Sequence, residues 1–536
     1  MARSTRAAAR ADGSDAVAVT VRMYKGILGD CFLLRFTRGE RTSRVLIDCG
    51  IIQGVAGAKG RMQEIAADIV AQCGGDVAEG RAGHLDLLVV THEHWDHISG
   101  FGQAAEIFIG EDGGQPLLEI GRLWMAWTED PEDDLAAELR GRFDRRKKAV
   151  AMMGLAAAGA VNAFAAAPAE AATGLEAFVG PLDEAGALGF GSKLTGRAIM
   201  AKLQEVASAT DYLRPGQVVE TPGEVAIRTF VLGPPRSKDR LFKDSPSAGD
   251  RKETYLDEPD VCEGPILALA EKGNEADLSA FSPFAPRHRR LTRREVERCN
   301  AARGDRASEA PDVFGWLQRH YFDPRPGCRY EANRPKDHDC RKDLFCSLDQ
   351  GQRRIDNDWM QAAGALALKL DSDTNNTSLV LAFELPGGEV LLFAADAQVG
   401  NWLSWHDQTY AAAGGEVTAE ALLGRTILYK VGHHGSHNAT LDEKGLRMMR
   451  DPRLTAMIPV VEAVAKKQPG HGWKMPFPDL KSELLVRTSG RILRGDCAAG
   501  RDLDHGEDRD LKPGREFLDR VADPDHQLWV EYRVSG

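Results

Sequence analysis

The stretch THEHWDHISG, residues 91–100, places three histidines and two acids within ten positions. It directly follows HLDLLVV (84–90), an apolar run typical of a strand that is covered on both faces. Imidazoles and carboxylates gathered at the end of a buried strand are costly to bury unless something binds them, and a metal ion does so. This stretch therefore predicts a metal site at the edge of a sheet.

The spacing within the stretch indicates how the ligands divide. His92 and His94 alternate along an extended segment and so face the same way, whereas Asp96 and His97 follow where the chain turns toward a helix. That arrangement suits two adjacent ions better than one. Imidazole and carboxylate ligands favour Zn²⁺, with Mn²⁺ or Fe also compatible, and we expect one or two ions.

Other apolar strands also end in residues of ligand type. SRVLIDCG (43–50) leads to Asp48, and the hairpin TSLVLAFELPGGEVLLFAAD (377–396) ends at Asp396, an acid able to bridge two ions. RTILYKVGHHGSHN (425–438) continues into His433, His434 and His437. Because the carboxyl ends of strands meet at one rim of a sheet, we expect these side chains to converge. Lys430, just before the histidines, is interpreted as an ordinary strand-edge charge.

The motifs LIDCG, THEHWDHISG, LLFAADA and LYKVGHHGSHN together resemble those of the metallo-β-lactamase fold hydrolases. GILGDCFLLRF and NNTSLVLAF make the chain most similar to the branch that includes the soluble domain of ComEC-type competence proteins. The resemblance covers roughly residues 17–100 and 370–500. It implies an α/β fold, namely a four-layer αββα sandwich with large, mostly helical or irregular insertions and a site at the edge between its two sheets.

The resemblance also implies roles for individual residues. His92 and His94 would hold one metal, and Asp96 and His97 the second, with Asp396 bridging them and His433 completing the second site. Asp48 would orient a ligand through hydrogen bonds. Asp96 and His434 are the catalytic candidates, with His434 suited to proton transfer. The remaining expected second-shell residues or ligands are Ser436, His437 and Asn376, the last standing near the place where many members of the family have a further histidine.

The organisation of the chain is expected to be discontinuous. We expect a disordered tail over 1–16, a first half of the fold over 17–235 with a helical insertion at about 115–215, an insertion or subdomain over 236–351, and a second half with a C-terminal segment over 352–536. Residues 482–496 are expected to form a hairpin, and the alanine-rich stretch 149–167 a packed helix rather than a membrane contact. The insertion contains a group that could bind structural zinc: Cys328, His338, Cys340 and Cys346.

Charge and cysteine content narrow the classes of function. A net charge of −12 argues against a passive nucleic-acid coat protein. Nine scattered cysteines indicate reduced thiols and a cytoplasmic protein, with no stable membrane association expected. The basic runs 140–148 and 286–298 are either solvated helix faces or phosphate contacts.

We expect a metal-dependent hydrolase whose activated water attacks a phosphodiester, with nucleic acid or a nucleotide as substrate. The resemblance suggests a place in a defence-type system. The alternatives are a hydrolase acting at the carbonyl centre of a lactone, amide or thioester, and a metal-bearing interaction protein without turnover. Protein partners are not predicted.

Overall fold

The computed structural model describes residues 16–53, 55–110, 114–158, 195–243, 298–301, 303–317, 362–412, 415–468, 472–497 and 512–534. The chain divides into two compact units. The first comprises Met1–Lys147, Glu170–Asp260 and Ala367–Gly536, and the second comprises Lys148–Ala169 and Val261–Leu366. In the second unit the described elements include η5 (Gly304–Glu309) and α10 (Val313–Leu317). The first unit carries both sheets and all the residues of the candidate metal centre.

The first sheet has eight strands in a mixed arrangement. Their order is β16 (Val521–Ala522), β17 (Trp529–Val534), β1 (Ala18–Tyr24), β2 (Phe32–Arg38), β3 (Arg41–Ile47), β4 (Gly83–Val89), β5 (Leu118–Ala126) and β6 (Thr210–Leu213). Strands β16 to β3 pair antiparallel, whereas β3, β4, β5 and β6 run parallel. The last strand, β17, therefore joins the first strand of the chain.

The second sheet has seven strands and is also mixed. Their order is β15 (Ile492–Arg494), β14 (Thr455–Ile458), β13 (Thr426–Lys430), β10 (Val390–Phe393), β9 (Val380–Glu384), β8 (Arg228–Gly233) and β7 (Val218–Glu220). Strands β15, β14, β13 and β10 are parallel, and the rest are antiparallel. The β9–β10 hairpin turns through Gly388, whose φ of 90° suits a residue without a Cβ.

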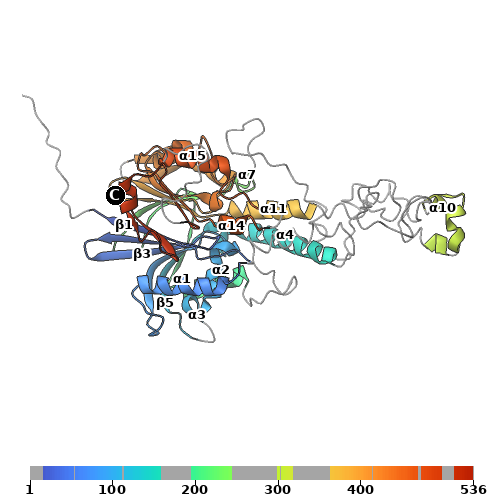
Figure 1. Ribbon diagram of the computed structural model, residues 1–536, viewed down its shortest axis with the longest axis horizontal. Coiled ribbons are helices and arrows are strands. Elements are labelled where there is room, and N and C mark those ends of the chain that lie inside the picture. The colour runs from blue at the N-terminus through green and yellow to red at the C-terminus, as the bar shows by residue number, and fades with distance from the viewer. Residues whose placement is uncertain are drawn as a thin grey trace, which may run out of the picture. The chain divides into compact units, whose positions relative to one another are not determined.

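Three clusters of buried apolar residues hold these elements together. One cluster contains residues of both sheets. Successive side chains of a strand point to opposite faces, so Leu34 of β2 lies in this cluster and its neighbour Leu33 lies in the next one. The second joins the first sheet to α1 (Ala58–Gln72), α2 (Trp95–Gln103), α3 (Ala105–Phe108) and α6 (Gly196–Val206). The third joins the second sheet to α12 (Val399–Trp405), α13 (Ala419–Gly424) and α15 (Pro478–Thr488). The fold is thus of mixed α/β class, with α1, α2 and α3 on one side of the strands and α15 on the other (Figure 1).

Several expectations about the elements are wrong. Residues 482–496 form the end of α15 followed by β15 rather than a hairpin. The segment 115–215, expected to be a helical insertion, contains α4 (Asp134–Ala158) and α6, but it begins with strand β5 and ends with strand β6 of the first sheet. The two halves also exchange strands, because β7 and β8 join the second sheet while β17 joins the first. Residues 1–15 of the tail expected over 1–16, and most of the 236–351 insertion, lie outside the described residues.

The alanine-rich stretch is described only in part. Residues 149–158 belong to α4, and the rest of 149–167 lies outside the described residues. Within the described part of the chain, no helix combines the length and apolarity needed to cross a membrane.

Candidate metal centre

The polar residues at the strand ends come together as the parallel pairing requires. Strands β3 and β4 run parallel, as do β10 and β13, so their carboxyl ends lie at corresponding edges. Asp48 follows β3, and His92 lies just beyond β4. Asp396 lies just beyond β10, and His433 and His434 follow β13. Each of these five side chains is at most 5% exposed.

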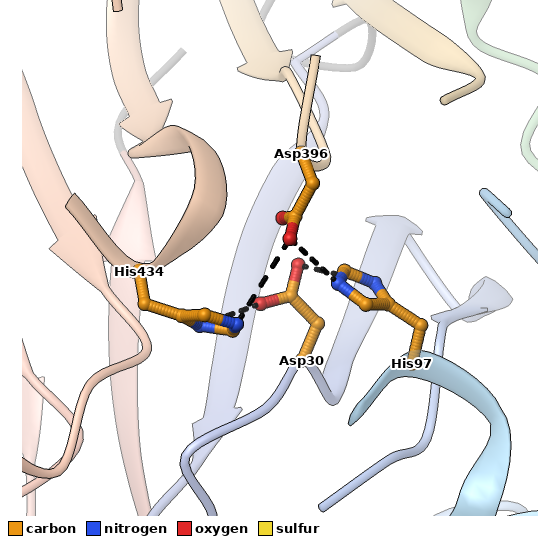
Figure 2. A group of neighbouring side chains, drawn as sticks. All are labelled: Asp30, His97, Asp396 and His434. Carbon is orange, nitrogen blue, oxygen red and sulfur yellow. Dashed lines mark ion pairs between the residues drawn. The ribbon is translucent and has the colours of Figure 1, made fainter. Parts of the chain in front are cut away.

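Four buried residues form a group that could hold a metal ion. Asp30, His97, Asp396 and His434 each offer a ligand atom, and these atoms lie within 4.8 Å of one another. Figure 2 shows the two imidazole rings on either side of the two carboxylates. Two members, His97 and Asp396, are predicted ligands. His434 was predicted as a catalytic residue, and Asp30 was not predicted to have any role.

The Nε2 atoms of the two rings face carboxylate oxygens. His97 Nε2 lies 3.2 Å from Asp396 Oδ2 and 3.9 Å from Asp96 Oδ2. His434 Nε2 lies 2.8 Å from Asp96 Oδ2 and 4.0 Å from Asp396 Oδ2. Two ligand atoms bound at about 2.1 Å to one tetrahedral ion would be about 3.4 Å apart, so the four separations bracket that value.

The Nδ1 atoms of four histidines form hydrogen bonds with other groups of the protein. Thr91 Oγ1 donates to Asp48, so it accepts from His92 Nδ1 at 3.1 Å, and His97 Nδ1 donates to Asp48 at 2.7 Å. Ser436 Oγ donates to Asn438 and so accepts from His433 Nδ1 at 3.0 Å, while His434 Nδ1 donates to the Pro459 carbonyl at 2.8 Å. These partners place the Nδ1 proton and leave Nε2 as the nitrogen available to a metal in each ring.

Several buried atoms of the centre are unsatisfied in the described structure. His92 Nε2, His97 Nε2, Asp96 Oδ1 and Asp396 Oδ2 have no hydrogen-bond partner among the described residues. A buried polar atom without a partner costs about 1–3 kcal/mol. Imidazole and carboxylate atoms left in this way at one place fit a cation, so these residues fit the metal that the sequence predicts.

Asp30 lies beside a buried lysine. Lys430 Nζ forms an ion pair with Asp30, donates to Asp396 Oδ1 at 3.3 Å and donates to the Ala395 carbonyl at 2.9 Å. Lys430 is only 1% exposed, so its interpretation as a strand-edge charge is wrong. The ammonium also fixes Asp396, because Oδ1 accepts from Lys430 and from the backbone N–H of His433 at 3.1 Å, which leaves Oδ2 toward the histidines.

Burial and neighbouring charges divide the histidines into two groups. Burial lowers the pKa values of His92, His94 and His433, to about 4 for the last two, so these imidazoles are neutral. Burial also acts to lower the pKa values of His97 and His434, but the surrounding carboxylates outweigh it and raise both. The carboxylates therefore favour the protonated forms of His97 and His434, and a metal cation could take the place of those protons.

The backbone around the centre is strained. Asp48, Ala395, His433 and His434 have φ values of 55°, 47°, 43° and 53°, and the described chain has only two other non-glycine residues with positive φ. Such conformations cost about 1 kcal/mol or more each and persist where the surroundings impose them. The tight turns aim successive side chains of the histidine loop in different directions, which a regular helix or strand would not do.

The remaining predicted residues lie elsewhere or act indirectly. Asn376 is not placed as a ligand, because its Oδ1 accepts from the backbone N–H groups of Gln398 and Asn401, both at 3.2 Å, and its Nδ2 donates to the Lys243 carbonyl. Its amide therefore joins the start of α12 to a neighbouring loop. His437 lies against Phe477, with ring centroids 5.9 Å apart.

Other sequence predictions concern charges and cysteines away from the centre. The basic run over 140–148 makes internal contacts. Arg140 donates to the carbonyls of Thr128 and Asp130, Arg146 pairs with Asp373, and Lys147 pairs with Glu93. Residues 286–297 of the basic run 286–298 lie outside the described residues, as do the predicted zinc ligands Cys328, His338, Cys340 and Cys346.

Sequence reasoning missed Asp30 because it considered only the carboxyl ends of strands. β2 pairs antiparallel with β3, with Phe32 opposite Ile47, so the start of β2 lies at the end of β3. The available signal was the Gly-Asp pair just before an apolar strand.

Comparisons with known proteins add no relative: no family model matches the chain, and no curated protein matches it significantly. The fold and the centre together define an α/β protein with a buried histidine–aspartate group able to hold a metal.

Proposed function

We propose that this protein is a metal-dependent hydrolase of the metallo-β-lactamase type, with an αββα sandwich formed by the two sheets and the helices outside them. The observation that carries the proposal is the convergence of two Nε2 atoms and two carboxylate oxygens, from strand ends of both sheets, at separations of 2.8–4.0 Å. The sequence resemblance supports the same conclusion independently of these distances.

The ligand set that we propose is Asp96, His97, Asp396 and His434. Asp30 approaches the two rings at 3.8 Å on their Nδ1 sides, which already donate to Asp48 and to the Pro459 carbonyl. Asp30 is therefore better explained as the partner of Lys430. Two imidazoles and two carboxylates favour Zn²⁺, with Mn²⁺ or Fe as alternatives. When bound, such an ion polarises a substrate oxygen and lowers the pKa of water.

His433 and His434 exchange their predicted roles in this proposal. His434 Nε2 contacts two ligand carboxylates, so it takes the position expected of His433. His433 Nε2 lies 3.9 Å from Asp396 Oδ2, and the bond between its Nδ1 and Ser436 fixes its ring. We propose that His433 contacts the substrate or the attacking water, because its neutral ring carries a lone pair toward the centre.

A phosphodiester, in a nucleotide or nucleic acid, is the substrate class that we propose, on the strength of the ComEC-type resemblance. A small ester or lactone is the second candidate. The observation that favours it is the internal pairing of the basic run on α4, since Arg140, Arg146 and Lys147 are already engaged by protein groups. A long phosphate backbone needs cations that the protein has not already paired.

The test compares a phosphodiester with a carbonyl substrate. Purified protein is loaded with Zn²⁺ or Mn²⁺ and assayed with bis-p-nitrophenyl phosphate and with a chromogenic lactone. We expect phosphodiester cleavage that falls at least 100-fold in His97→Ala and His434→Ala. His84→Ala is the matched control, because His84 is 59% exposed on β4. Bound metal with neither substrate cleaved, or full activity in both ligand variants, would refute the proposal.

A further inference from the structure

A loop from the C-terminal part of the chain, 472–477, packs against the histidine loop, 432–438, that follows β13. The backbone N–H of Phe477 donates to the Gly435 carbonyl at 2.8 Å. The approach is close, because a Cβ built on Gly435 would lie 3.0 Å from the Cβ of Pro476. Gly435 directly follows the proposed metal ligand of the histidine loop, so the 472–477 loop lies next to the centre.

The histidine loop is also the least buried side of the centre. The four proposed ligands are at most 1% exposed, whereas His433, Ser436 and Asn438 are 4–6% exposed. His437, between the last two, is more exposed than either. This gradient indicates that a substrate reaches the centre past the histidine loop, on the side where the 472–477 loop lies.

Lys474 is an exposed cation on an anchored backbone. The N–H of Trp473 donates to the Ala465 carbonyl at 2.9 Å, and the Trp473 ring packs against the apolar cluster of the second sheet. Met475 belongs to the same cluster and is 8% exposed. The residues on both sides of Lys474 are thus held in place, while its own side chain is exposed and makes no hydrogen bond or ion pair within the described part of the chain.

The state of this charge differs from that of the basic run on α4. Arg140, Arg146 and Lys147 are engaged by protein groups, whereas Lys474 keeps its charge available to a ligand. An available lysine attracts phosphate as a point charge and positions a nucleic acid without reading its bases. The two residues from Pro476 to Lys474 span at most about 7 Å, so the ammonium stands close to the histidine loop.

We propose that Lys474 binds the phosphate next to the scissile one, and that the substrate of the centre is a single-stranded nucleic acid. This inference rests on the proposed hydrolase function and deepens it. The scissile phosphate has to approach ligands that are at most 1% exposed, which a flexible single strand can do and a closed duplex cannot. A small ester has no neighbouring phosphate and would leave Lys474 without a role.

Salt-dependent binding tests the inference without turnover. The full chain is stripped of metal with chelator and titrated with a fluorescent single strand of about 12 nucleotides, followed by anisotropy at several salt concentrations. We expect Lys474→Met to weaken binding about 5-fold, the scale of one exposed ion pair. The slope of log Kd against log salt should fall by about 0.7, the value for one phosphate contact on a single strand. Lys474→Arg should retain the wild-type affinity and slope.

Arg41→Met is the matched control, because it removes one positive charge from an exposed position far from the centre. Arg41 begins β3, and the other end of this strand leads to Asp48, about 20 Å away. The control should leave both the affinity and the salt slope at their wild-type values. Equal effects of Lys474→Met and Arg41→Met would show that only the net charge matters and would overturn the inference.

Steady-state kinetics of the Zn²⁺-loaded protein give a second readout. Lys474→Met should raise KM for cleavage of the same strand about 5-fold and leave kcat within about 2-fold, as expected for a contact made equally in the ground state and the transition state. A wild type that cleaves bis-p-nitrophenyl phosphate but neither binds nor cleaves the strand would overturn the inference and leave the proposed function intact. A Zn²⁺-loaded wild type that cleaves neither substrate would overturn the proposed function itself.

Discussion

Replacement of Asp48 by asparagine probes the hydrogen bonds that support the centre. Asp48 is fully buried and accepts three hydrogen bonds, from the Thr91 backbone N–H at 2.8 Å, Thr91 Oγ1 at 2.7 Å and His97 Nδ1 at 2.7 Å. Its φ of 55° is tolerated by asparagine, so Asp48→Asn changes charge and hydrogen bonding without adding backbone strain. An amide has one acceptor oxygen, and its NH₂ group cannot accept a hydrogen bond from Thr91 Oγ1 or His97 Nδ1.

The magnitude follows from the bonds that are lost. A hydrogen bond to a charged group contributes about 1.5–3 kcal/mol, and a neutral one about 1 kcal/mol. Losing the His97 bond and weakening the other two should lower the free energy of unfolding by about 3 kcal/mol. Because Asp48 also orients a proposed ligand, Zn²⁺ affinity should fall about 10-fold to 100-fold.

The assay is urea unfolding of the metal-free protein, followed by a Zn²⁺ titration. Thr91→Val is the matched variant. It removes the Thr91 Oγ1 bond to the Asp48 carboxylate and the acceptor of His92 Nδ1 but keeps the backbone N–H, so it should cost about 2 kcal/mol. If Asp48→Asn unfolds within about 0.5 kcal/mol of the wild type, or binds Zn²⁺ equally well, Asp48 does not support the centre as argued. If Asp48→Asn costs less than Thr91→Val, the bond to His97 contributes nothing.

Four further predictions test other features. Lys430→Met should lower the free energy of unfolding by about 3–5 kcal/mol, because Asp30 and Asp396 lose their buried counter-ion. Adding Asp30→Asn should recover part of this loss in urea unfolding, because one of the two carboxylates is then neutral. Glu129→Gln should stabilise the protein at pH 8 by about 3 kcal/mol and by much less at pH 5. Burial and nearby charges raise the pKa of Glu129 from 4.5 to about 7, so the folded protein loses stability as pH rises through that window. Gly50→Ala should weaken Zn²⁺ binding in a titration, since the added Cβ would lie 2.2 Å from the Asp96 carbonyl carbon. Zn²⁺ at 100 times its dissociation constant should raise the free energy of unfolding by about 2.7 kcal/mol. This should raise the melting temperature, and chelator should return the melting temperature to that of the metal-free protein.

The central strands and the convergence of their polar ends could be predicted because each signal is local. Apolar runs such as 85–90 and 426–430 are short, and a single polar cluster follows each. The hairpin predicted over 482–496 was wrong because alternating apolar residues in that stretch also fit one face of a short helix, and the proline at position 478 is typical of a helix start. The exchange of β8 and β17 between the halves depends on pairing over long separations, for which the sequence has no local mark.

The parts of the centre that the sequence did not predict depend on contacts between distant segments. Lys430 is an ordinary residue in the sequence, and only its packing against Asp30 and Asp396 turns it into a buried counter-ion. Asp373 on α11 (Ala362–Asn375) is likewise an ordinary acid in the sequence, and its buried partner Arg146 lies on α4, 227 positions away. A rule based on spacing alone cannot find such ion pairs, so the three-dimensional contacts of α4 and α11 have to be known first.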